Sequence, residues 1–289
     1  MHIRAFTLPL AVALVAVAAP AIAQDADAVP PAATDAPPPP VVDRPFSGLY
    51  VGAAGGYDVQ PNDVGERINF NRAGANVITD AAGANAFSPG FCNGRARGAT
   101  NEPGCANDRD DWAYYGRVGF DVQGGAFVFG GVVEFGKTEI ADSVTAFSTT
   151  PASYTLTRAI DWELGLRGRA GFAARSTLFY GTGGAGYARI KNRFTTTNTA
   201  NAFAVSGTRQ RWGYQVGGGI EQKIGRHFSI GLEYLYHNYD NTGGGVTVTQ
   251  GTAPATNPFV LNGAANTVFT RSDDTFKWHS LRATLGFRF

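Results

Sequence analysis

Residues 278–289 read WHSLRATLGFRF, and this stretch decides the fold. From Leu281 to Phe289 the odd positions are apolar and the even positions are polar or small. Successive residues of a β-strand point to opposite faces, so the stretch predicts a strand with one apolar and one polar face. The strand stops on an aromatic residue, Phe289.

Similar runs recur along the chain, separated by turn-forming residues. Most are longer than the ~5–6 residues typical of soluble strands and are long enough to cross a membrane when tilted. No amphipathic helix is expected between them. The predicted strands are 46–58, 112–123, 126–138, 158–172, 177–191, 208–224, 228–240 and 275–289.

The connections between these runs alternate in length. Three are hairpin turns (124–125, 173–176 and 225–227), and four are long (59–111, 139–157, 192–207 and 241–274). This alternation predicts an all-β fold: an eight-stranded antiparallel up-and-down transmembrane β-barrel with short periplasmic turns and long extracellular loops. A ten-stranded barrel would result if 245–248 and 268–271 paired as a further hairpin. We favour the interpretation that they extend the neighbouring strands above the membrane.

The polar faces combine charged residues with glycine. Glycine weakens a solvated strand but suits the crowded interior of a small barrel. We therefore predict polar residues inside and lipid outside, instead of the reverse arrangement of a soluble lipocalin-like barrel. Strand 158–172 is the example, with Asp161 and Glu163 inward and Ile160 outward. The outer aromatic girdles are assigned to Trp112, Tyr114, Tyr180, Trp212, Tyr214, Tyr234 and Tyr236. The runs 46–58 and 177–191 are rich in glycine on both faces, and their inward sides are not assigned.

Charged residues of both signs are expected to line the barrel interior. An eight-stranded barrel has room inside only for side chains, so opposite charges that pair across it would close the lumen. We interpret the set as a structural polar core, and a narrow passive channel is the alternative. The predicted network is Arg117, Asp121, Glu134, Glu163, Arg167, Arg169, Arg211, Glu221, Glu233 and Arg282.

The N-terminal residues predict export. Arg4 precedes an apolar run over 5–19, and Ala21-Ile22-Ala23 fits a cleavage site. The run is shorter than the ~20 residues that a spanning helix needs. We therefore expect a signal peptide at 1–23, a Pro/Ala-rich periplasmic tether at 24–45 and the barrel domain at 46–289, with the product in the outer membrane.

Composition excludes some classes of function. Only 16% of the residues are charged and the formal net charge is +1, so no nucleic-acid partner is expected. The two cysteines, Cys92 and Cys105, lie close together in a turn-rich segment. In an exported protein this spacing predicts a disulfide. A metal site would need further ligands nearby, and neither a metal nor another cofactor is expected.

Two motifs that suggest chemistry are interpreted as structural. Residues 181–186 match G-x-G-x-x-G, but a strand follows where a nucleotide site needs a helix. A rim hydrolase could use His237, Asp240, Asp273, Asp274, His279 and Ser280 at the upper ends of the last two strands. Alternation points His237 inward and His279 outward, so we interpret both as interfacial histidines and expect no enzymatic activity.

Three short motifs, in their order along the chain, resemble a known family. FSGLYVG at 46–52, YGTGGAGY at 180–187 and TLGFRF at 284–289 are similar to alphaproteobacterial outer-membrane β-barrel ("porin family") proteins, whose architecture is related to the OmpA membrane domain and OmpX. The ending resembles the assembly signal of such barrels, carried here by Leu285, Phe287 and Phe289.

The resemblance implies an eight-stranded barrel and roles in envelope integrity, surface antigenicity, adhesion or, in some members, haemin binding. It also implies outer-membrane lipid, lipopolysaccharide and the barrel-assembly machinery as partners, with a possible host or surface ligand bound through the loops. The first loop is unusually long for this family and carries the cysteine pair, so the loop functions of the family do not transfer directly.

Overall fold

This computed structural model describes residues 44–60 and 65–289. The predicted signal peptide and residues 24–43 of the predicted tether lie outside the described residues. Within the described part, the regular structure is β-strand apart from one short 3₁₀ turn, η1 (Leu261–Gly263). The same part contains no helix with the length and apolar character needed to cross a bilayer.

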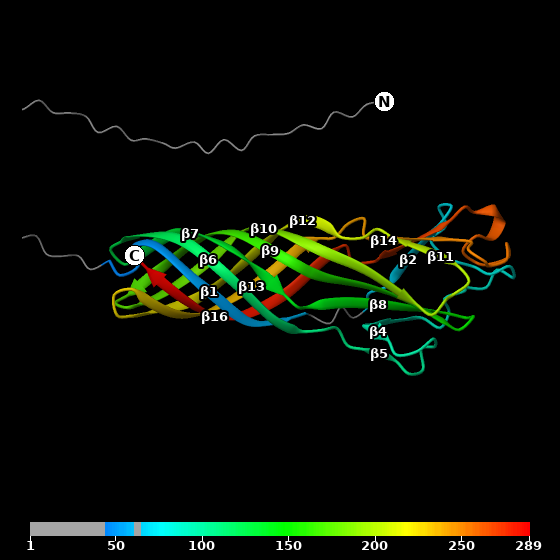
Figure 1. Cartoon of the computed structure of the whole chain (residues 1–289), viewed down its shortest axis with the longest axis horizontal. Coiled ribbons are helices and arrows are strands. Elements are labelled where there is room, and N and C mark those ends of the chain that lie inside the picture. Colours follow the sequence, from blue (N-terminus) through cyan, green and yellow to red (C-terminus); the bar gives the residue numbers. More distant parts are fainter. Residues whose placement is uncertain (1–43, 61–64) are drawn as a thin grey trace, which may run out of the picture. The chain divides into compact units, whose positions relative to one another are not determined.

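Eight strands close into a barrel (Figure 1). Each pairs antiparallel with its neighbours along the chain, and the last pairs with the first in a register that places Tyr50 opposite Arg288. The predicted eight-stranded up-and-down barrel is confirmed. Its strands are β1 (Gly48–Val59), β6 (Asp111–Gly124), β7 (Phe127–Thr138), β9 (Ala152–Ala174), β10 (Thr177–Thr196), β12 (Arg209–Ile224), β13 (Phe228–Asp240) and β16 (Thr275–Arg288).

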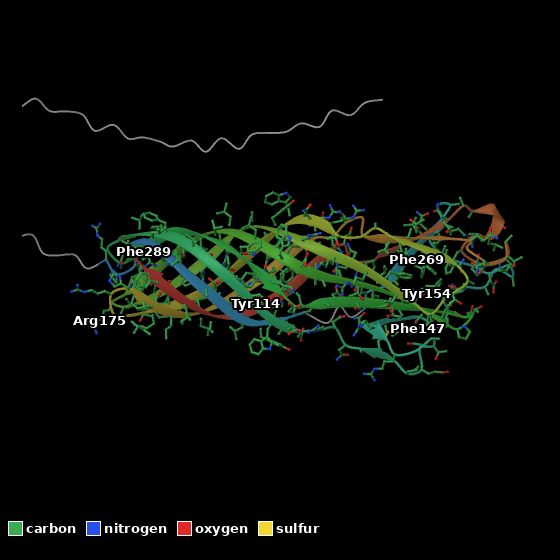
Figure 2. The ribbon with its side chains drawn as sticks, viewed as in Figure 1. Tyr114, Phe147, Tyr154, Arg175, Phe269 and Phe289 are labelled. Atoms are coloured by element: carbon green, nitrogen blue, oxygen red, sulfur yellow. A yellow bond between two sulfur atoms is a disulfide. The ribbon has the colours of Figure 1, made fainter. Side chains whose placement is uncertain are left out.

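The three short turns lie at one end of the barrel, together with the C-terminus. Each contains a residue in the left-handed region: Gly125 (φ 61°), Arg175 (φ 57°) and Gly225 (φ 69°). Glycine adopts this conformation without a steric penalty, whereas Arg175 does not. Figure 2 shows Arg175 and Phe289 at this end and Phe147, Tyr154 and Phe269 at the long-loop end.

The apolar faces of the strands point outward. Trp112 is 65% exposed and Leu285 61% exposed, while the residues that alternate with them are buried. The two unassigned strands are also resolved: β1 turns Tyr50, Ala54 and Asp58 inward, and β10 turns in its even-numbered residues. Tyr180 therefore lies inside the barrel and not in the outer girdle to which the sequence assigned it.

A β-bulge in β9 reverses the faces above it. The register with β10 shifts between Arg189 and Ile190, which pair with Trp162 and Ile160, so Asp161 is the extra residue. Ile160 consequently points inward and is buried, and Asp161 lies outside with Lys191. The expected alternation, with Asp161 inward and Ile160 outward, is wrong. The bulge adds one residue to the strand and so exchanges the inward and outward positions beyond it, and the residue types around it do not reveal this change.

The long connections are themselves built of strands. Residues expected to form the 139–157 loop are the hairpin of β8 (Ala141–Ser148) with the extended start of β9. A second sheet has the order β11 (Ala202–Val205), β14 (Gly245–Thr249), β15 (Thr267–Arg271) and β2 (Ile68–Arg72). The segments 245–248 and 268–271 thus pair with one another outside the barrel, where they continue the pairing of β13 with β16 after a break, and they add no strand to the barrel. The remaining short strands are β3 (Phe91–Asn93), β4 (Arg95–Ala96) and β5 (Cys105–Ala106).

These long-loop strands share an apolar core. Its centre is a group of aromatic rings, and the Phe70 and Phe87 rings stack with centroids 4.1 Å apart. Phe269 contacts Phe70 edge-on at 4.9 Å and Tyr154 at 5.8 Å. We name this assembly of the second sheet, β8 and the upper part of β9 the cap.

Candidate functional site: the barrel interior and two loop pockets

The central layer of the barrel interior, named here the central cluster, is an ion network. Arg167 donates to Glu134 at 3.0 Å and to Glu233 at 3.2 Å, and Arg117 donates to Glu233 at 3.3 Å. Arg282 donates to the other oxygen of Glu134 at 2.5 Å. All five side chains are almost fully buried. Each carboxylate thus contacts more than one guanidinium, which offsets the desolvation of both partners.

A second ion network lies toward the short turns. Arg169 donates to both Asp121 and Glu221, and Arg288 donates to Asp121 at 2.8 Å. Both guanidinium groups stack on the ring of Tyr50, at 4.8 Å and 4.7 Å from its centroid. Arg288 was not in the predicted set, although the terminal alternation places it on the polar face.

Toward the long loops, Glu163 is the centre of a hydrogen-bonded layer. It accepts hydrogen bonds from the Tyr239 hydroxyl at 2.5 Å, Gln215 at 2.6 Å and the Tyr115 hydroxyl at 2.8 Å. His237 Nδ1 lies 2.8 Å from the same carboxylate, and the His237 ring stacks on Trp278. His237 is therefore a buried lumen residue, so the inward direction predicted for it is correct and the interfacial position is wrong.

Two of the six predicted hydrolase candidates come together in this layer. Ser280 Oγ lies 3.1 Å from His237 Nε2, so Ser280, His237 and Glu163 have the order of a nucleophile, a base and an acid. However, the Ser280 hydroxyl donates to Asp58, and Arg282 Nη2 lies 3.0 Å from the same Nε2. Ser280 Oγ and Arg282 Nη2 thus both lie within hydrogen-bonding distance of Nε2, and Arg282 occupies a position beside the imidazole that a simple Ser-His-acid arrangement would leave open.

The other candidates lie apart from this group. His279 is on the outer face, with Nδ1 2.6 Å from the Tyr234 hydroxyl. Asp240 contacts Thr242, and Asp273 contacts Thr275 and Lys277. The predicted set therefore does not form one site at the rim.

Arg211 does not belong to the lumen network, contrary to the sequence analysis. Its guanidinium donates to the Thr242 carbonyl and lies 3.9 Å from Asp240 at the upper end of the barrel. The alternation in β12 gives the correct face, but it does not show how high along the barrel axis the residue lies. Of the ten charged residues predicted for the network, the other nine are buried.

The cavity next to the lower network is small. It is lined by Tyr50, Arg117, Arg169, Glu221 and their neighbours and has a volume of about 10 Å³. This volume is close to the room that one water molecule needs. Beside this network the charged side chains and Tyr50 therefore leave little open space.

The predicted assembly residues all lie on the outer face of β16 or directly after it. Leu285 and Phe289 are 61% and 69% exposed. The Phe287 ring lies between those of Phe228 and Phe289, with centroids 5.2 Å from each. Their role in assembly remains a prediction.

The structure joins Cys92 and Cys105 in a disulfide, with Cα atoms 6.2 Å apart. It connects β3 to β5 within the first loop. The loop is further attached to β8, because Ala96 N donates to Thr145 Oγ1 at 3.2 Å and the same hydroxyl donates to the Gly94 carbonyl at 2.8 Å.

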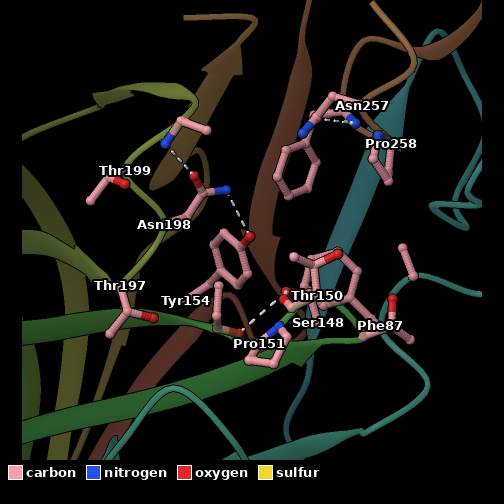
Figure 3. Close-up of a pocket in the computed structure, with 15 residues that line it drawn as sticks. Phe87, Ser148, Thr150, Pro151, Tyr154, Thr197, Asn198, Thr199, Asn257 and Pro258 are labelled. Carbon is pink, nitrogen blue, oxygen red and sulfur yellow. Dashed lines mark hydrogen bonds between the residues drawn. The ribbon is translucent and has the colours of Figure 1, made fainter. Parts of the chain in front are cut away.

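A first pocket opens in the cap between the β8–β9 turn and the segments after β10 and before η1. Figure 3 shows Phe87, Tyr154 and Pro258 around it, with Asn198 donating to the Tyr154 hydroxyl at 2.9 Å. Its volume is about 270 Å³. The sequence carries no signal for this pocket, because its lining residues come from all four long connections.

A second pocket of about 400 Å³ lies beside the first. Arg95 and Arg97 of the disulfide loop line it, together with hydroxyl residues of β9 and β10 and with Thr197, which also lines the first pocket. The Arg-x-Arg motif between the two cysteines was the available sequence signal for this pocket.

Comparison with known proteins gives relatives of similar sequence in Brucella and Rhizobium. The 31 kDa outer-membrane immunogenic protein of Brucella melitensis biotype 1 is 29% identical over 110 residues, which are 38% of this chain and 45% of the relative. The 22 kDa outer membrane protein of Rhizobium leguminosarum bv. viciae is 27% identical over 154 residues, which are 53% of this chain and 64% of the relative. The matched region is less than two thirds of the length of either relative. No protein-family model matches the chain.

Among solved structures, the outer membrane protein OprG from Pseudomonas aeruginosa is 12% identical with a TM-score of 0.43, covering 84% of this chain and 97% of that one. The outer membrane protease OmpT from Escherichia coli is 8% identical with a TM-score of 0.40, covering 86% and 99%.

Proposed function

We propose that this chain, an outer-membrane β-barrel protein similar to outer-membrane proteins of alphaproteobacteria, is a structural and surface-interaction protein of the envelope. In this proposal its lumen is closed to solutes, it carries out no catalysis, and its cap is the part that meets the cell's surroundings.

The observation that carries the proposal is the burial of the central cluster. Arg282 and Glu233 are 0% and 1% exposed, and they lie between the charged layer below and the Glu163 layer above. A water-filled pore would hydrate at least part of such a layer. The three polar layers inside the eight strands support the proposal that the barrel interior stabilises the fold and does not conduct solutes.

The surface role is supported by the cap. The long loops are folded around their own apolar core and contain two open pockets, and the relative from Brucella is named an immunogenic protein. Loops that only connected strands would not need a separate core.

Single-channel recording of the purified full-length protein in planar bilayers tests the closed lumen. We expect no stable open level, and a steady conductance of nanosiemens size would overturn the proposal. A narrow passive channel is the second candidate. If the protein is such a channel, replacing Arg167 or Glu134 by alanine should change its conductance. If the barrel is closed, the same variants should be less stable, and the native protein should show no conductance for them to change.

Labelling on intact cells tests the surface role. Val77 is 55% exposed in the long-loop part, and Arg226 is exposed in a short turn. A membrane-impermeant maleimide should label Val77→Cys and should leave Arg226→Cys unlabelled until the cells are lysed. Labelling only after lysis at Val77→Cys would overturn the surface assignment.

A further inference from the structure

Two arginines in the second pocket have no ion-pair partner among the described residues. Arg95 and Arg97 line the pocket and are exposed. Within residues 44–60 and 65–289, their guanidinium groups form no hydrogen bond and no ion pair, whereas Arg109 in the same loop pairs with Asp111. In the part of the first loop that the structure describes, no acidic side chain forms an ion pair with either arginine.

The two arginines lie on and directly after a short strand whose backbone is held by several contacts. Arg95 and Ala96 form β4, which pairs with Cys105 and Ala106 of β5. Arg97 N donates to the Gly104 carbonyl at 3.2 Å, and the disulfide connects the flanking strands. The backbone that carries both arginines is thus fixed before a ligand binds, so no loop has to be ordered on binding.

The rest of the pocket wall carries hydroxyl groups and no carboxylate. Ser153 and Thr155 come from β9 and Thr195 and Thr196 from β10. Guanidinium groups form their strongest hydrogen bonds with phosphate, sulfate or carboxylate oxygens. Hydroxyl groups add neutral hydrogen bonds, so the pocket suits an anionic group attached to a hydroxylated molecule.

The first pocket continues this surface. Thr197 lines both pockets, and the first pocket adds the apolar surfaces of Pro151, Pro258 and Phe87 to threonine and asparagine side chains. None of its lining residues is acidic. Apolar surface beside hydrogen-bonding groups accommodates the two kinds of face that a sugar ring presents.

We propose that the two pockets form one binding site for an anionic saccharide, with a phosphate or sulfate group on Arg95 and Arg97 and a neighbouring sugar ring in the first pocket. The inference rests on the surface-interaction part of the proposed function and names its ligand class. The same chemistry is present in the phosphorylated sugars of lipopolysaccharide and in sulfated glycans outside the cell.

Equilibrium binding to the purified full-length protein in micelles tests the site. The probes are a heparin-type sulfated oligosaccharide, its desulfated form, and lipopolysaccharide before and after phosphatase treatment. We expect at least one charged probe to bind and its uncharged counterpart to bind about tenfold or more weakly, because charge-assisted hydrogen bonds are lost. The charged probe that binds identifies the source of the ligand.

Variants assign the binding to this site. Arg95→Gln with Arg97→Gln should weaken the charged probe by about tenfold or more, and Thr195→Val should weaken it by a smaller factor. The matched control, Arg175→Gln with Arg226→Gln, removes two exposed charges at the short-turn end and should leave binding unchanged. Heat-modifiable gel mobility verifies that every variant has a folded barrel.

The outcomes separate this inference from the function it rests on. If no charged probe binds, or if both double variants weaken binding equally, the site is overturned. If the site is overturned but Val77→Cys is still labelled on intact cells, the proposed surface role is retained and only the ligand class is wrong. Labelling only after lysis would overturn the surface role itself.

Discussion

Glu233 illustrates how a single residue stabilises the barrel interior. It accepts hydrogen bonds from Arg117 at 3.3 Å, from Arg167 at 3.2 Å and from the Tyr180 hydroxyl at 2.9 Å. Glu233→Ala leaves two buried arginines short of a partner, so we expect a loss of about 3–5 kcal/mol in the free energy of unfolding. Urea unfolding in micelles, followed by gel mobility, measures the loss.

The matched control for this prediction is an exposed glutamate. Glu139 contacts Lys137 at 2.5 Å, but both side chains are more than a third exposed. Glu139→Ala should therefore change the free energy of unfolding by less than about 1 kcal/mol. Equal urea midpoints for the two variants would contradict the stabilising role of the central cluster.

Asp108 gives the first loop a dependence on pH. Burial raises the pKa of Asp108 to about 7, and the nearby Asp142 carboxylate adds to the rise, while its Oδ1 accepts a hydrogen bond from Ser143 N at 2.7 Å. A raised carboxyl pKa means that the folded loop favours the neutral acid. Its stability contribution is complete below the ordinary value of 3.8 and is lost as the pH rises through about 7.

We therefore expect the contact between the first loop and β8 to weaken as the pH rises from 3.8 to about 7. Hydrogen exchange at the Ser143 amide, corrected for the intrinsic rate, measures the weakening. Asp108→Asn keeps the oxygen acceptor and cannot ionise, so its protection should not vary with pH. Equal pH dependence in the native protein and the variant would rule out Asp108 as the cause.

At the scale of one strand, the two faces of β6 respond differently to added volume. A Cβ on Gly119 would lie 2.2 Å from the Tyr50 ring, which the guanidinium groups of Arg169 and Arg288 cover. A Cβ on Gly116 meets no atom within 4 Å. Gly119→Ala should cost about 1–3 kcal/mol through overpacking, whereas Gly116→Ala should be neutral or slightly stabilising. The urea midpoints of both variants check the difference, and a loss of stability in Gly116→Ala would contradict the assigned faces.

The strands of the barrel could be predicted because alternation is a local signal. When every second residue is apolar, as in 281–289, the outward face of the strand can be assigned from that segment alone, without knowing which strands pair with it. The same signal places Glu134, Glu163 and Arg167 inside. It fails at Asp161, because a bulge changes the phase of the alternation, and at Tyr180, because the glycines around it leave no phase to read.

The structure of the loops could not be predicted in this way. The strand β14 pairs with β15, and β15 also pairs with β2, whose residues are distant in sequence. Such pairings depend on how the loops pack against one another. A short segment such as 245–249 does not show which other loop it will pair with. For the same reason the two loop pockets were not predicted, whereas the charged lumen was.

At the scale of the whole molecule, the barrel and the cap have interiors of opposite polarity. The barrel encloses ion networks and presents apolar residues outward, whereas the cap encloses aromatic rings. Arg271 is the last residue of β15 and lies where the cap meets the barrel, shortly before the barrel strand β16 begins. It donates to both oxygens of Glu66, to Asp142 Oδ1 at 2.6 Å and to the Leu156 carbonyl at 3.1 Å, so it connects the first loop, β8 and β9 to the second sheet.

Arg271→Ala should therefore open the cap without unfolding the barrel. The variant leaves the buried carboxylates of Glu66 and Asp142 without their shared cation, a change that typically costs about 3–5 kcal/mol. The central cluster makes no contact with Arg271, so heat-modifiable mobility should be unchanged, while limited trypsin digestion should cut the cap faster. Arg109→Ala is the control, because the Arg109 side chain is 66% exposed and forms its ion pair, within the described residues, with Asp111. If Arg271→Ala also abolishes heat-modifiability, the cap and the barrel depend on one another for folding, and the assignment of separate interiors fails.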